Sequence, residues 1–113
     1  MGMPQRFSMI STPRQVLLRL CQATDYGEIQ GLNVYAGEPS FSPHPIVVQD
    51  IKLDQDAGGR PESDLDDFTL CEEVIRLFRQ FDEIGAGSID RIVVAAGIPR
   101  RVVIRRPLAE APR

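Results

Sequence analysis

The same order of structural signals occurs twice along the 113-residue sequence, and this repeat restricts the folds that the chain can adopt. Each copy reads as an amphipathic helix, a strand, a turn of the form Gly-x-Pro and a second strand. One helix with one hairpin is marginally stable alone, whereas two such units can join their hairpins and bury both helices against the sheet. We therefore expect an α+β fold, a tandem αββ duplication with a four-stranded antiparallel sheet and two helices packed on one face. The predicted helices are residues 13–24 and 70–84, and the predicted strands are residues 28–36, 46–51, 88–96 and 101–105.

Identical residues support the duplication. The two helices align at a spacing of 57 residues and the first strands at a spacing of 60, so we place a three-residue insertion between them. Similar αββ units can also agree through shared physical requirements, and that alternative stays open. The residues of the first copy with an identical partner in the second are Thr12, Arg19, Leu20, Asp25, Gly27, Ile29, Val34, Ala36, Gly37 and Pro39.

Both predicted helices begin with a capping signal. Thr12 is followed by Pro13 and, three residues after the threonine, by Gln15. Thr69 has Glu72 in the same relative position. A threonine oxygen can accept from an otherwise unpaired backbone N–H while the longer side chain reaches back to the N–H of the cap. The sequence thus predicts Thr12 and Thr69 as the N-caps.

We expect a single domain over residues 1–113, because a chain of this length and composition matches one ordinary globular unit. Its predicted parts are a flexible N-terminal arm (1–11), a first αββ unit (12–53), an acidic linker (54–68), a second αββ unit (69–108) and a tail (109–113).

Part of the second unit resembles a small bacterial family. Residues 73–105 carry Val74-Ile75-Arg76-Leu77, then Gly87-Ser88-Ile89, and later Gly97 and Val102-Val103-Ile104. This pattern is similar to the YezD-like proteins, short uncharacterised chains with one helix followed by a hairpin that begins with Gly-Ser. Pro99 and the acidic segment depart from that family. The resemblance implies a helix with a hairpin and transfers no activity.

Charge is unevenly distributed along the chain. Residues 1–49 have no net charge, residues 50–90 carry −8, and residues 91–113 carry +5, which together give the net −3. In the last hairpin, strand alternation places Arg91, Arg101 and Arg105 on the sheet face away from the helices, with Val103 between them. Tyr35 is expected on the same face of the other hairpin. These five residues are the candidate binding residues.

Two functions fit this face. The arginines can bind phosphates, which would suit a nucleic-acid-binding accessory protein. They can also protect a sheet edge or pair with the acidic segment, within the chain or across a dimer. The pI of about 5.1 and the lack of an aromatic platform favour the second reading. We expect an interaction or adaptor protein that self-associates or docks a partner protein through the exposed sheet face, with nucleic-acid binding as the alternative.

Other functional classes lack a signal. Cys21 and Cys71 read as core thiols in a reducing compartment, so we expect a cytoplasmic protein. His44 stands between prolines without a second metal-binding residue nearby, and the stretch that begins at Asp54 lacks the glutamate of a calcium loop. No catalytic or nucleotide-binding motif occurs, and no apolar run approaches the length of a membrane span or of a secretory leader. We expect no enzyme activity, cofactor, metal, membrane contact or small-molecule substrate.

Overall fold

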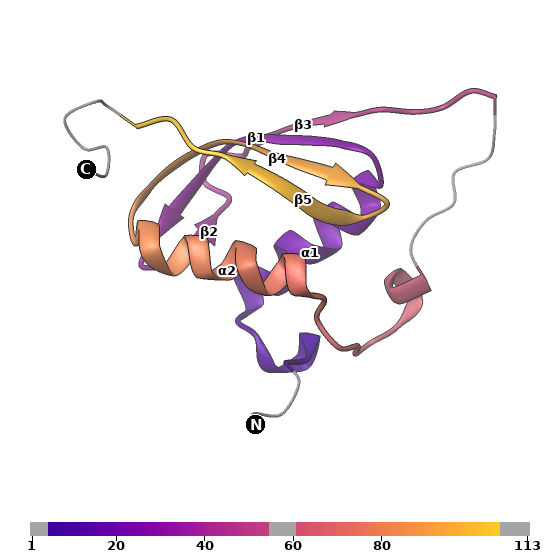
Figure 1. Cartoon of the computed structure of the whole chain (residues 1–113), viewed down its shortest axis with the longest axis horizontal. Coiled ribbons are helices and arrows are strands. Elements are labelled where there is room, and N and C mark those ends of the chain that lie inside the picture. Colours follow the sequence, from indigo (N-terminus) through magenta and orange to yellow (C-terminus); the bar gives the residue numbers. More distant parts are fainter. Residues whose placement is uncertain (1–4, 55–60, 107–113) are drawn as a thin grey trace.

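In the part of the chain that the structure describes, five strands form one antiparallel sheet, and two α-helices lie on the same side of it (Figure 1). The structure is a computed structural model and describes residues 5–54 and 61–106. The α+β fold expected from the sequence is confirmed. The helices are α1 (Thr12–Thr24) and α2 (Glu72–Ile84), and the strands are β1 (Gly27–Tyr35), β2 (Glu38–Ser40), β3 (Ile46–Gln49), β4 (Gly87–Ala95) and β5 (Ile98–Val103).

The sheet has five strands rather than the expected four, because one edge row is divided. The strand order is β2-β1-β4-β5, and β3 also pairs with β1. β2 pairs with Asn33, Val34 and Tyr35 at one end of β1. β3 pairs with residues 27–30 at the other end. Residues 41–45 interrupt this row, so β2 and β3 follow one another along the same side of β1.

The core lies between the sheet and the two helices. The two central strands supply Ile29, Leu32 and Val34 from β1 and Ile89, Ile92 and Val94 from β4, all buried. In each strand the third, sixth and eighth residues are the buried ones. β1 and β4 run antiparallel, and they pair Ile29 with Ile92 and Leu32 with Ile89. The helices complete the core with the buried side chains Leu17, Leu18 and Cys21 of α1 and Val74, Leu77, Phe78 and Phe81 of α2.

The N-caps predicted from the sequence are wrong for both helices. Ser11, rather than Thr12, has the extended backbone of an N-cap, and its Oγ accepts from the N–H of Arg14 at 3.4 Å. Cys71 precedes α2 without a side-chain cap. The hydroxyl of Thr69 instead accepts a hydrogen bond from the Arg6 guanidinium at 3.3 Å. Both helices therefore begin at positions that are 60 residues apart.

The spacing of 60 residues holds for the central strands as well as for the helices. α1 and α2 each have 13 residues, and β1 and β4 each have 9. Two backbone hydrogen bonds also correspond: the N–H of Gly37 donates to the carbonyl of Gly85, and the N–H of Gly97 donates to the carbonyl of Asp25, both at 2.8 Å. Each hairpin turn is thus bonded to the end of the other unit's helix. The insertion expected between helix and strand does not occur.

The first segment that the structure describes is held against the chain before α2. Phe7 is buried and stacks on Phe68 with 4.8 Å between ring centroids. The N–H of Phe7 donates to the carbonyl of Phe68, and the N–H of Leu70 donates to the carbonyl of Gln5. Residues 5–11, expected as part of a flexible arm, therefore contribute to the core. The remaining parts of the expected arm (1–4), linker (55–60) and tail (109–113) lie outside the described residues.

Arg14 connects the two helices and the first hairpin turn. Its Nη2 donates to the carbonyl of Gly37 at 3.0 Å and to Asp82 Oδ1 at 2.7 Å. The guanidinium also lies 4.8 Å from the centroid of the Phe78 ring, and its Nε is 3.5 Å from a carboxylate oxygen of Glu38. The side chain is 17% exposed, so these interactions are partly shielded from water. We expect the interactions of Arg14 to stabilise the packing of α1 against α2.

Candidate interaction surface

The sheet face opposite the helices is uncovered among the described residues, and charged and apolar side chains alternate across it. Residues directly opposite one another on paired strands project from the same face. Arg91 of β4 is opposite Gln30 on one side and Val103 on the other. Val93 is likewise opposite Arg101. Because the neighbouring Ile92 is buried on the helix side, Arg91, Arg101 and Val103 project from the uncovered face.

Two of the three candidate arginines have carboxylate neighbours within the same molecule. Arg91 Nε lies 3.5 Å from Glu28 Oε2, and Arg91 Nη1 lies 3.4 Å from Asp90 Oδ2. Arg105 Nη2 lies 3.5 Å from the other oxygen of Asp90. Arg101 forms no ion pair with a residue that the structure describes. Most of the positive charge of this face is therefore already balanced.

Tyr35 does not join the arginines. It lies at the end of β1, opposite Glu38 of β2, and its side chain is exposed. Val93 of β4 lies between Arg101 of β5 and Glu28 of β1, so these three residues form one row across the sheet. Glu28 is seven residues away from Tyr35 along β1. At about 3.3 Å per residue these positions are separated by roughly 23 Å. The five candidate residues therefore do not form one compact site, and no arginine–aromatic stacking platform exists among them.

The edge formed by β3 is a surface that the sequence analysis did not single out. All four residues of β3 are exposed, and Ile46, Val47 and Val48 have exposed fractions of 65%, 42% and 45%. The apolar character continues past the strand, because Ile51 and Leu53 are also exposed. Among the strands of the described ranges, β3 pairs with β1 alone, so its outer backbone N–H and C=O groups can pair with another strand. Exposure of such an edge is a property of the topology and leaves no distinct sequence signal.

The edge formed by β5 differs from the β3 edge. Pro99 lacks an N–H, and the pairing register of β5 shifts beside Val93 and Val94, which leaves Arg100 as an extra residue. Arg100 and Arg101 are both exposed on this strand. Proline, a bulge and charged side chains are the features that prevent unwanted strand pairing at sheet edges. Of the two outer edges, the one at β3 is thus the less protected.

The two cysteines and the histidine differ in how far their side chains are buried. Burial raises the pKa of the Cys21 thiol to about 12, so that it stays protonated. Cys71 is a second free thiol, and His44 is exposed in the loop after β2. Within residues 5–54 and 61–106, no three His, Cys, Asp or Glu side chains are grouped as metal ligands would be. In the same ranges, no helix has the length and apolar character that crossing a membrane requires.

Comparisons with family models, with curated proteins and with solved structures find no match to this chain. The resemblance of residues 73–105 to the YezD-like proteins therefore stays a prediction.

Proposed function

We propose that the protein is a non-catalytic interaction protein that self-associates through its sheet, and that the contact is the β3 edge together with the adjoining uncovered face. The observation that carries this proposal is that β3 is an apolar edge strand with every side chain exposed. A soluble chain normally blocks such an edge, as it does at β5. A second copy of the same strand satisfies both its free backbone groups and its apolar side chains.

A two-fold axis perpendicular to the sheet is compatible with this contact. If Val47 faces Val47 of the second copy, Ile46 faces Val48 in both directions, so the three central opposed pairs are apolar. Ile46 and Val48 of both copies then project from the same face, because residues two apart on a strand share a face. The two sheets would continue into one, and no charged pair would be buried at the centre.

Sedimentation equilibrium of the full chain tests this proposal. We expect a reversible monomer–dimer equilibrium whose dimer fraction rises with protein concentration. A chain that stays monomeric up to near-millimolar concentration would exclude self-association. Docking of another protein at the same edge would then be the remaining form of the interaction hypothesis.

Nucleic-acid binding by the arginine-flanked hairpin is a second candidate. The observation in its favour is that Arg101 is exposed and has no ion-pair partner among the described residues. Its test is the salt dependence of binding to duplex and single-stranded DNA, since phosphate contacts release counterions and make the affinity fall steeply with salt. If Arg101→Ala and Arg105→Ala leave that dependence unchanged, this function is excluded.

We also propose that the two halves are copies of one αββ unit. Support comes from the equal lengths of the helices and of the central strands, from their common spacing of 60 residues, and from the reciprocal bonds of Gly37 and Gly97. Superposition of the two halves is the test, and helices and hairpins that fail to overlay would contradict it. The two free thiols fit a reducing compartment, and we propose the cytoplasm.

A further inference from the structure

The backbone hydrogen bonds of β3 determine which of its residues can pair with a second copy. The N–H of Asp50 donates to the carbonyl of Tyr26 at 2.7 Å, so the backbone of Asp50 is directed towards the β1 side. The direction of hydrogen bonding alternates along an antiparallel strand, so Val48 is also directed towards β1 and Val47 is directed outwards. The register of the proposed dimer, with Val47 facing Val47 of the second copy, therefore brings outward backbone groups together.

The same register continues beyond β3 and places His44 opposite Asp50 of the second copy. His44 precedes a proline, which favours an extended backbone in line with the strand. Since Asp50 is directed towards β1, the facing His44 and Asp50 form a non-hydrogen-bonded pair, in which the Cα atoms are about 4.5 Å apart and the side chains are close. The two-fold axis produces this pair twice.

Neighbouring registers of the dimer do not form this pair. A register with Val48 on the axis places Asp50 opposite Ile46. A register with Ile46 on the axis places Asp50 opposite Ser42. Of these three registers, the one with Val47 on the axis is thus the one that opposes a carboxylate to the histidine and apolar side chains to one another.

The two members of the pair have no other ionic partner in the described parts of the chain. His44 and Asp50 are both exposed, and neither forms an ion pair with a residue that the structure describes. Lys52, beyond Asp50, lies with its Nζ 5.4 Å from the centroid of the Tyr26 ring. The charged side chains that face this region from β1, β4 and the chain after β5 are paired with one another; they are Glu28, Asp90, Arg91 and Arg105.

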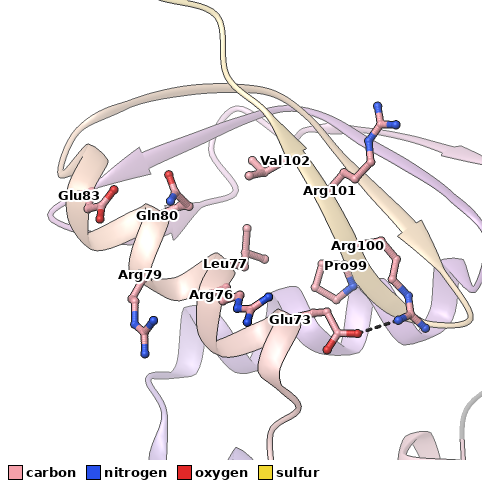
Figure 2. A pocket seen from close by; sticks show the side chains of 10 residues that line it. All are labelled: Glu73, Arg76, Leu77, Arg79, Gln80, Glu83, Pro99, Arg100, Arg101 and Val102. Atoms are coloured by element: carbon pink, nitrogen blue, oxygen red, sulfur yellow. Dashed lines mark hydrogen bonds and ion pairs between the residues drawn. The ribbon is translucent and has the colours of Figure 1, made fainter. Parts of the chain in front are cut away.

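The β3 edge differs in this respect from the groove between α2 and β5 (Figure 2). The groove has a volume of about 410 Å³. Arg76 and Arg100 on its border are already paired with carboxylates of α2. Figure 2 shows the guanidinium groups of Arg79 and Arg101 directed away from the groove. Charge complementarity therefore identifies an occupant at the β3 edge, and that occupant is a second copy of this chain.

We propose that protonation of His44 strengthens the β3 dimer, because each protonated imidazole pairs with Asp50 of the second copy. This inference rests on the self-association proposed above. A histidine ordinarily gains its proton as the pH falls from about 7.5 to about 5.5, while an aspartate stays ionised. His44 is the one histidine of the sequence. Because the ion pair needs the proton, its contribution to association is present at the lower pH and is lost as the pH rises.

Sedimentation equilibrium of the full chain at about pH 5.5 and about pH 7.5, at one ionic strength, tests the inference. An exposed cross-strand ion pair contributes about two- to threefold in affinity, so the two pairs should lower Kd about fivefold at the lower pH. His44→Gln and Asp50→Asn should each remove this dependence, and the double variant should show no further loss. His44→Lys, which keeps its charge, should dimerise at both pH values as the natural chain does at the lower one.

A control variant separates the local pair from net charge. Val16→Lys adds a positive charge on α1, away from the sheet, and should dimerise like the natural chain at each pH. Equal dissociation constants of the natural chain at both pH values, a pH dependence that persists in His44→Gln, or equal gains in Val16→Lys and His44→Lys would overturn the role of His44 and leave the β3 dimer in place. A chain that stays monomeric at both pH values would exclude this inference together with self-association.

Discussion

The substitution Val48→Lys is the most direct test of the β3 edge. Val48 projects from the uncovered face at the edge of the sheet, and its side chain is exposed. The folded monomer therefore tolerates a lysine there, because a long side chain can extend into water. In the proposed dimer the same position faces Ile46 of the second copy. We expect the variant to fold normally and to dimerise more weakly.

The exposed fractions of β3 set the size of the effect. Full burial of a valine or isoleucine side chain stabilises by about 1.5–3 kcal/mol. Covering the surface that Ile46, Val47 and Val48 still expose then contributes about 3 kcal/mol per copy. Strand pairing adds about 1 kcal/mol per backbone hydrogen bond, while association itself costs about 4 kcal/mol or more. The natural dimer should thus be weak, in the micromolar range. Lysine at position 48 in both copies removes apolar contact and adds charge repulsion, together about 3 kcal/mol, or roughly 100-fold in Kd.

Val16 provides a matched control for Val48. It is also a valine, it is 47% exposed, and it lies on α1 rather than on the sheet. Val16→Lys should leave the monomer–dimer equilibrium unchanged. Sedimentation equilibrium of the natural chain and of both variants at the same concentrations measures the three dissociation constants. If Val48→Lys dimerises as tightly as the natural chain, or if Val16→Lys weakens the dimer equally, the β3 edge is not the contact.

Three further predictions concern the fold. Gly27→Ala should lower the free energy of unfolding by about 3 kcal/mol or more, because an added Cβ would lie 2.0 Å from a backbone oxygen of β3. Gly87→Ala should lower it by about 1 kcal/mol, because the nearest atom to its Cβ is a methyl carbon of Ile84 at 3.2 Å, and urea denaturation compares the two variants. Arg14→Met should lower the free energy of unfolding by about 2 kcal/mol in the same assay, whereas Arg76→Met, which removes an exposed ion pair, should lower it by less than about 0.5 kcal/mol. Equal losses in the two variants would contradict the connecting role of Arg14. The pKa of Asp67 is lowered to about 2 by hydrogen bonds from the Arg6 guanidinium and from the Ser8 N–H. The stabilisation of the folded state by these bonds is therefore complete above pH 4 and is lost as the pH falls towards 2, and an NMR titration of the Asp67 carboxyl with a midpoint near 4 would refute this prediction.

The layer arrangement was predictable because it follows from local pattern. The 3.6-residue period identifies the buried faces of α1 and α2, and alternation identifies the buried residues at the ends of β1 and β4. The alternation is broken once in each central strand, because Ile29 and Leu32, like Ile89 and Ile92, are three residues apart and both buried. β2 was not predictable in the same way, because Gly37-Glu38-Pro39 reads as a turn. Proline is accepted there since β2 is an outer strand, where the missing N–H breaks no ladder. That status depends on the pairing of distant segments.

The errors at the helix starts and the N-terminal segment have a similar origin. Ser11 and Thr12 are both good caps, and the choice between them involves Glu38, whose carboxylate accepts from the Ser11 hydroxyl at 2.6 Å. Phe7 carries no periodic pattern, and its burial depends on Phe68, which is far away in the sequence. Of the candidate site, alternation places Arg91 on the uncovered face correctly. It cannot show that Glu28, on another strand, balances that charge.

The difference between the two outer edges determines what kind of assembly the proposed contact can form. The sheet has one outer edge at β3 and the other at β5. If both edges were unprotected, each copy could pair with a further copy on either side, and the assembly would grow into a fibre. A contact between two β3 strands about a two-fold axis uses the unprotected edge of both copies at once. The outer edges of the resulting dimer are then the two β5 strands, which carry Pro99, the bulge at Arg100 and the charge of Arg101. Pairing at β3 therefore ends at two copies.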